Sequence, residues 1–62
     1  MSIRIEIQPA PNRMARVELW LNGRCMSISP ALPYAAAREQ AQEMAGLAQT
    51  EVVDHTQYGI FA

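Results

Sequence analysis

The stretch that decides the fold is VELWLNGRCMSI, residues 17–28, which carries the chain's only tryptophan and only cysteine on either side of an Asn-Gly pair. Apolar and polar residues alternate before and after that pair, which is typical of strands that bury one face. Asn22-Gly23 between two such runs predicts a type I′ turn, because both central positions of that turn need positive φ. We therefore expect a tight β-hairpin here.

A two-residue turn also predicts the pairing of the two strands. The expected partners are Leu21–Arg24, Trp20–Cys25, Leu19–Met26, Glu18–Ser27 and Val17–Ile28. In this register the aliphatic side chains share one face of the hairpin, while Trp20, Cys25 and Glu18 share the other face.

An earlier strand is predicted by the strict alternation of isoleucine with polar residues in SIRIEIQ, residues 2–8. The two prolines and the asparagine of PAPNRMA, residues 9–15, indicate a loop after it. One alignment of this strand with the hairpin would set Glu6 against Glu18, two like charges. A shift by two residues replaces that clash by opposite charges, worth about 0.2–1 kcal/mol per pair. The expected pairs are therefore Ile5–Val17, Arg4–Glu18 and Glu6–Arg16, with Ser2 opposite Trp20.

A helix is predicted over residues 29–49, with Ser29 or a residue near Leu32 as its cap and Pro30 or Pro33 in its first turn. Its apolar residues fall at helical spacing and form one stripe, which consists of Tyr34, Ala37, Ala41, Met44, Ala45 and Ala48. A further strand is expected over residues 51–55, then a turn over 56–59, and a short final strand or tail over 60–62.

The elements predict an α+β fold in the order β-β-β-α-β, with an antiparallel three-stranded meander, one helix packed on one sheet face and a C-terminal strand. The 62 residues suffice for a single domain, 1–62. A chain this short buries only about 60% of its unfolded surface, so self-association would add stability. One helix covers one face, and we expect that face to hold the aliphatic side chains. Trp20 is then expected to point away from the helix.

Composition narrows the classes of function. The net charge of −1 argues against a dedicated nucleic-acid binder. No apolar run approaches the length of a membrane span, and the charged N-terminus does not resemble a signal peptide, so we expect a cytoplasmic protein. One cysteine cannot form an internal disulfide, and no spacing of Cys and His predicts a metal site or a cofactor.

Three segments carry a family resemblance: VELWLNGR (17–24), SPALPYAAAREQAQEMAGLA (29–48) and EVVDHTQYGI (51–60). With them the chain resembles small bacterial and phage proteins grouped as a domain of unknown function. The resemblance implies the same order of strands and helix over nearly the whole length, and it brings no catalytic residue with it.

The candidate site is the sheet face that carries Trp20 and Cys25. An exposed tryptophan buries a large area in an interface at low entropic cost. The alternative is that Tyr58 or Phe61 folds over the indole. The candidate interaction residues are Trp20, Cys25, Glu18, Arg16 and Arg13.

Catalysis is not expected. His55 and Asp54 are adjacent in a predicted strand, so their side chains point to opposite faces and do not act as a pair. Nothing near Cys25 predicts a reactive thiol, and we interpret it as a small filler beside Trp20.

The sequence therefore predicts a small non-enzymatic interaction module. It would bind a protein partner or a second copy of itself through the face around Trp20. A phage-type protein that binds and modulates a protein of its bacterial host is one such case. If the first or third strand lies at a sheet edge, that edge offers a second route. The alternative is a nucleic-acid-associated regulator that uses the loop around Arg13.

Overall fold

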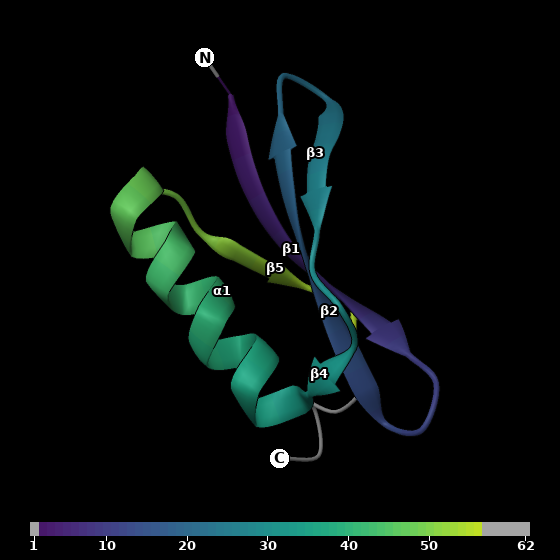
Figure 1. Ribbon diagram of the computed structural model, residues 1–62. Helices are drawn as coiled ribbons and strands as arrows, with labels where there is room; N and C mark the ends of the chain where they lie inside the picture. Colours follow the sequence, from purple (N-terminus) through teal and green to yellow (C-terminus); the bar gives the residue numbers. More distant parts are fainter. Residues whose placement is uncertain (1, 57–62) are drawn as a thin grey trace.

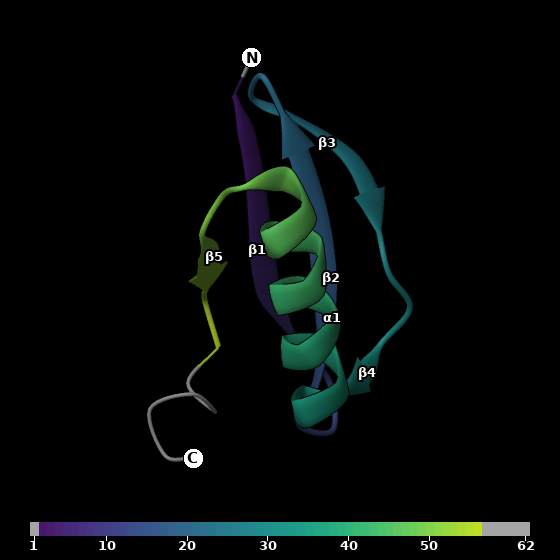
Figure 2. The same cartoon turned by 90° about the vertical axis from the view of Figure 1, so that its left-hand side faces the viewer.

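The fold consists of one sheet and one helix in two layers (Figure 1). The computed structural model describes residues 2–56. The elements in chain order are β1 (Ile3–Ala10), β2 (Met14–Leu21), β3 (Arg24–Ile28), β4 (Leu32–Pro33), α1 (Tyr34–Ala48) and β5 (Val52–Asp54). The sheet order is β3-β2-β1-β5, and β4 pairs with β2. α1 lies across one face of β1 and β2 (Figure 2), so the other face has no helix over it within the described residues.

The predicted α+β class and element order are confirmed. The sequence did not predict where the last strand would lie, and β5 runs parallel to β1 with Ile5 beside Val52. It also did not predict β4, whose two residues pair with Met14 and Ala15 of β2. The turn and the strand or tail expected after His55 lie outside the described residues, apart from Thr56.

The β2–β3 hairpin has the predicted turn. Asn22 and Gly23 have φ values of 51° and 81°, and the two pairs next to them, Leu21–Arg24 and Trp20–Cys25, are as predicted. Beyond Trp20 the prediction is wrong, because a bulge shifts the register of β3 by one residue. The observed pairs are Leu19–Ser27 and Glu18–Ile28, where Leu19–Met26, Glu18–Ser27 and Val17–Ile28 were expected.

The bulge is held by Ser29, which replaces Ile28 as the partner of Val17. The Ser29 hydroxyl accepts a hydrogen bond from Val17 N at 2.9 Å, and Ser29 N donates to Val17 O at 2.9 Å. Ser29 therefore bonds to β2 just beyond the end of β3 and does not cap the helix. Met26 and Ile28 are 55% and 57% exposed, so the prediction that they join the core is wrong.

The register between β1 and β2 also differs from the prediction. Ile5 lies opposite Leu19, and Glu6 lies opposite Glu18, the like-charge pair that charge alone disfavours. The turn decides the register: Asn12 and Arg13 both have positive φ, 62° and 61°, as in a type I′ turn, and Met14 N donates to Pro11 O at 3.3 Å. A gain of about 0.2–1 kcal/mol per charged pair does not outweigh the geometry of a tight turn.

The helix begins later than predicted, at Tyr34, because residues 32–33 are used as β4. Pro33 precedes it and provides no side-chain cap. At the other end Gln49 adopts a left-handed conformation with φ 55°, and hydrogen bonds from Gln49 N and Thr50 N return to the last turn, as in a Schellman motif. Within residues 2–56, no helix has the length and apolar character needed to cross a membrane.

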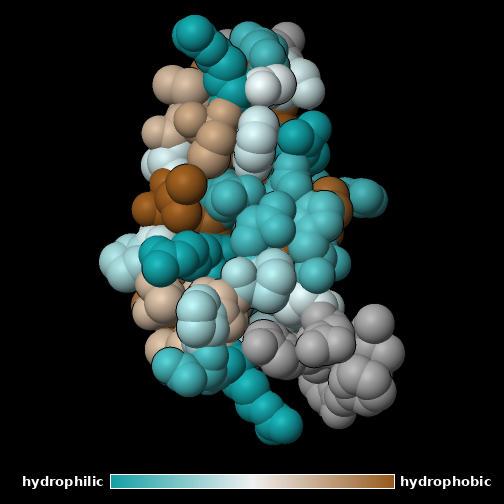
Figure 3. Space-filling view, turned by 90° about the vertical axis from the view of Figure 1, so that its right-hand side faces the viewer, coloured by the Kyte–Doolittle hydropathy of each residue, from teal (hydrophilic) through white to brown (hydrophobic). Residues whose placement is uncertain are grey.

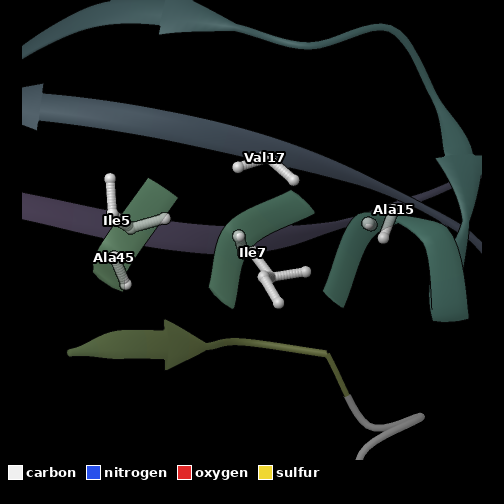
Figure 4. Close-up of a cluster of buried hydrophobic side chains, with 7 residues drawn as sticks. Ile5, Ile7, Ala15, Val17 and Ala45 are labelled. Atoms are coloured by element: carbon white, nitrogen blue, oxygen red, sulfur yellow. The ribbon is translucent and has the colours of Figure 1, made fainter. Parts of the chain in front are cut away.

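The core lies between α1 and the sheet and is small (Figure 4). The alanines at the centre of the predicted helical stripe are buried, and Tyr34 and Met44 pack beside them, as predicted. Small side chains let the helix approach the strands closely, but only Ile5 and Ile7 are large side chains that are fully buried. The buried residues are Ile5, Ile7, Ala15, Val17, Ala37, Ala41 and Ala45.

Candidate functional site

We call the sheet face opposite α1 the open face. Strand alternation and the observed registers place ten side chains on it: Arg4, Glu6, Gln8, Arg16, Glu18, Trp20, Cys25, Ile28, Val53 and His55. Figure 3 shows this side of the molecule as mainly hydrophilic through the middle, with smaller hydrophobic areas towards its sides.

Trp20 lies on the open face, half-buried, and two neighbours fix its ring. The guanidinium carbon of Arg4 lies 5.1 Å from the ring centroid, within the range of a cation–π contact. The indole Nε1 donates a hydrogen bond to Glu18 Oε1 at 3.0 Å. The prediction that Ser2 lies opposite Trp20 is wrong, because the observed register places Arg4 there. These two contacts therefore restrict the orientation of the indole. The proposed cover by Tyr58 or Phe61 lies outside the described residues.

Glu6 is the buried acid of the open face, only 6% exposed. Its carboxylate accepts hydrogen bonds from Arg4 Nε and Gln8 Nε2 and contacts His55 Nε2. Burial works to raise the pKa of Glu6, but the hydrogen bonds from Arg4 and His55 outweigh it and hold the pKa below its ordinary value of 4.5. The cluster ties β1 to the chain beyond β5 through residues far apart in the sequence.

Asp54 and His55 point to opposite faces, as predicted for neighbours in a strand. Asp54 accepts hydrogen bonds from the Tyr34 hydroxyl at 2.6 Å and from both the backbone N and the hydroxyl of Thr56 at 2.8 and 2.6 Å. Partial burial opposes ionisation of Asp54, yet the bonds from Thr56 and Tyr34 lower its pKa, and the same carboxylate raises the pKa of Tyr34. This contact joins the start of α1 to β5.

Cys25 is exposed on β3 opposite Trp20, and its thiol lies 3.7 Å from the Ser27 carbonyl oxygen. Beside it, Met26 and Ile28 expose more than half of their surface. β3 lies at one end of the sheet order and β5 at the other, whereas β1 is an interior strand. The sequence left open whether the first or the third strand lies at a sheet edge; β3 is an edge strand and β1 is not.

The arginines do not form the predicted pairs. Arg4 contacts Glu6 instead of Glu18, and Arg16 donates to the Ser29 carbonyl at 3.3 Å instead of facing Glu6. Arg13 is exposed in the β1–β2 turn, at the opposite end of β2 from Trp20. The structure therefore brings Trp20, Glu18 and Cys25 together and leaves Arg13 apart from them.

The sequence did not predict the contact of Glu6 with His55. These residues are 49 positions apart, and their contact depends on β5 lying beside β1, which no local pattern indicates. Among the described residues, no group of three or more His, Cys, Asp or Glu side chains is placed to hold a metal ion.

The resemblance to small bacterial and phage proteins stays a prediction. Comparisons with models of known protein families, with curated proteins and with solved structures found no match to this chain.

Proposed function

We propose that this protein is a small, non-enzymatic interaction module of the cytoplasm that binds a protein partner on the open face around Trp20. The observation that carries the proposal is an aromatic side chain held in place on a sheet face with no helix over it in residues 2–56. Tryptophan is enriched among the residues that dominate binding energy in protein interfaces.

The surroundings of Trp20 fit the anatomy of a protein interface. Ile28 lies on the same face opposite Glu18, is 57% exposed, and adds apolar area to that face. Charged groups border the apolar part: Glu18 accepts from the indole, and the pair of Arg4 and Glu6 lies next to it. An apolar patch next to charged groups gives affinity through burial and orientation through complementary charge.

Preorganisation supports the proposal further. A free tryptophan side chain loses rotamer freedom on binding, a cost of about 0.5–1.5 kcal/mol for an immobilised side chain. In this protein Arg4 and Glu18 already restrict the indole. The partner we expect is a bacterial protein, on the strength of the resemblance to small bacterial and phage proteins.

The test is capture from bacterial lysate on immobilised protein, with the wild type beside Trp20→Ala and Ile28→Thr. We expect both variants to lose at least about tenfold in recovery of the same bound protein, since each 1.4 kcal/mol of binding energy is a factor of ten. Leu47→Gln is the matched control, because Leu47 is an exposed aliphatic residue on α1 and not on the open face. Circular dichroism checks that each variant is folded.

If the wild type and Trp20→Ala recover equal amounts of the bound protein, the open face around Trp20 is not the binding surface and the proposal is wrong. Capture of nucleic acid by the wild type, lost on raising the salt concentration and lost in Arg13→Gly, would instead favour the nucleic-acid-associated alternative. Glycine suits the positive φ of that position, so the variant removes the guanidinium and keeps the turn.

A further inference from the structure

β5 is an edge of the sheet, and part of its backbone faces outward. His55 N donates to Ile7 O at 2.9 Å, so the backbone of residue 55 points towards β1. Backbone N–H and C=O groups alternate in direction along a strand, so those of Val53 point towards β1 and those of Val52 and Asp54 point away from it. In the described part of the chain no strand lies beyond β5 to receive them. The edge therefore offers the donors and acceptors of two residues to a further strand.

The two edges of the sheet differ in how well they could extend it. β3 carries the bulge, which interrupts regular pairing and is a common way of protecting an edge. β5 pairs with β1 through three consecutive residues without a shift in register. α1 lies across β1 and β2, and β5 lies at the side of the sheet beyond them (Figure 2). β5 is therefore the edge at which a regular strand fits.

We propose that β5 pairs antiparallel with β5 of a second copy, around a two-fold axis that passes between the two Val53 residues. In this register Val52 lies opposite Asp54 of the second copy, and Asp54 lies opposite Val52 of the second copy. Each of these pairs exchanges two backbone hydrogen bonds, so every outward group of Val52 and Asp54 gains a partner.

The two copies then form one continuous sheet. Residues that lie directly opposite each other in a sheet point to the same side, so the two open faces share one side of the sheet. Both helices lie on the other side, and they stay apart because each lies over its own β1 and β2 (Figure 2). The dimer therefore presents two copies of Trp20 on a single surface.

The side chains next to the axis fit this register. Val53 is 40% exposed in one copy and meets Val53 of the second copy, an apolar pair of β-branched side chains. Glu51 lies opposite His55 of the second copy, and symmetry repeats that pair on the other side of the axis. The Nε2 atom of His55 contacts Glu6, which leaves Nδ1 to face Glu51 of the second copy. A carboxylate and an imidazole attract each other when the ring is protonated and do not repel when it is neutral.

Other registers of the same two strands fit less well. An axis at Asp54 would set two aspartates opposite each other and would pair Val52 with Thr56, whose N–H is already bonded to Asp54 Oδ1. An axis at Val52 would pair Asp54 with Thr50, whose N–H is already bonded to Ala45 O. Only the axis at Val53 uses all the outward groups.

Sedimentation equilibrium of the whole chain tests the proposal, at concentrations from about 20 μM to about 2 mM because short interfaces are weak. A reducing agent is present, since Cys25 is exposed. We expect the wild type to dimerise and Val53→Glu to raise the dissociation constant at least about tenfold, because two carboxylates would meet at the axis. Val53→Lys should do the same, and an equimolar mixture of the two variants should recover the dimer as a heterodimer.

Two control variants change exposed aliphatic residues elsewhere. Ile28→Glu makes the matched substitution on β3, the other edge strand. Leu47→Gln changes the rim of an apolar hollow between the last turns of α1 and the sheet, which residues of β1, β2 and α1 line. Both should leave the dissociation constant within about twofold. A wild type that stays monomeric at the highest concentration, equal dimerisation by Val53→Glu, or a dimer that Ile28→Glu abolishes overturns the proposal.

Amide hydrogen exchange locates the contact. The N–H groups of Val52 and Asp54 should exchange more slowly as the protein concentration rises, because they gain partners only in the dimer. The N–H of His55 is bonded to Ile7 O within one copy and serves as the internal reference. Protection of Val52 and Asp54 that does not depend on concentration would show that the edge is covered within one chain, and would overturn the proposal. The inference does not rest on the proposed function: dimerisation of Val53→Glu and lysate capture by Trp20→Ala are measured separately, so either can fail alone.

Discussion

Replacing Glu6 by glutamine tests whether its buried carboxylate stabilises the sheet. The Glu6 side chain is 8% exposed and contacts two partners, the Arg4 guanidinium and the His55 imidazole, whose side chains are 48% and 42% exposed. A hydrogen bond to a charged group contributes about 1.5–3 kcal/mol, but partly exposed partners reduce that value through solvent screening. Glutamine has nearly the same shape as glutamate. Its amide NH₂ is a donor, however, so it cannot accept the hydrogen bond that Arg4 or His55 makes to the carboxylate oxygen in its place. We expect Glu6→Gln to lower the free energy of unfolding at pH 6–7 by about 1–2 kcal/mol.

The pH dependence gives the sharper result. The pKa of Glu6 is lower in the folded protein than its ordinary value of 4.5. A depressed pKa means that the stabilisation is fully present above the unfolded-state value and is lost as the pH falls through the folded-state value. The difference in stability between the wild type and Glu6→Gln that the carboxylate contributes should therefore be fully present at about pH 5–6 and shrink below about pH 4.5. Asp54 also has a lowered pKa, but it is present in both proteins and cancels in the difference.

Urea unfolding followed by fluorescence measures both effects, because Trp20 is the chain's only tryptophan and lies next to Arg4. Glu18→Gln is the matched control. It removes the other charge of the Glu6–Glu18 pair and keeps an acceptor for the indole, so we expect a change within about 0.5 kcal/mol. Two results would refute the reasoning: equal stability of the wild type and Glu6→Gln at pH 6, or a difference that grows as the pH falls.

Three further substitutions test the backbone and the core by chemical denaturation. Gly46→Ala should stabilise the protein by about 0.5–1 kcal/mol, because the added Cβ meets no atom within 4 Å in the interior of α1; destabilisation would show that this helical turn is strained. Arg13→Gly should leave stability unchanged or raise it by up to about 1 kcal/mol, since Arg13 has φ 61°, and a clear loss would contradict the type I′ turn. Ala41→Leu should cost at least about 1–3 kcal/mol, because Ala41 has no exposed surface, and a neutral result would contradict the close approach of α1.

Local patterns predicted the faces of β1 and β2 but not the registers of the sheet. Alternation separated Trp20 from the aliphatic residues of β1 and β2 correctly, since it depends only on strand geometry, but it failed for Ile28, which the bulge places on the open face. The β1–β2 register depends instead on Arg13 adopting positive φ, which is uncommon for a residue with a Cβ and has no strong sequence signal. The bulge depends on Ser29, whose hydroxyl bonds to Val17 N, although a serine before a proline near a predicted helix is typical of a cap. The conformation of Arg13 and the hydrogen bond of Ser29 are therefore both set by strand pairing and not by the local sequence.

The candidate site was predictable only where it rests on neighbours in the sequence. Trp20, Cys25 and Glu18 were assigned to one face from the hairpin alone, and the structure places them together. The buried Glu6 was missed, because its burial depends on His55 arriving from the far end of the chain on a parallel strand. No periodicity within either segment encodes which strand will lie beside it.

The hollow follows from the same small residues that build the core. Ala37, Ala41 and Ala45 draw α1 close to the middle of the sheet, where Ile7 and Val17 fill the space. Towards its C-terminal end α1 and the β2–β3 turn lie apart (Figure 1), and a hollow of about 340 Å³ lies there between α1 and the sheet. The residues present there line the gap without filling it, and Leu47 projects outward at its rim. The hollow is therefore the end of the core towards the last turn of α1, where Leu19 and Met44 still pack against the buried residues and Leu47 lies 84% exposed.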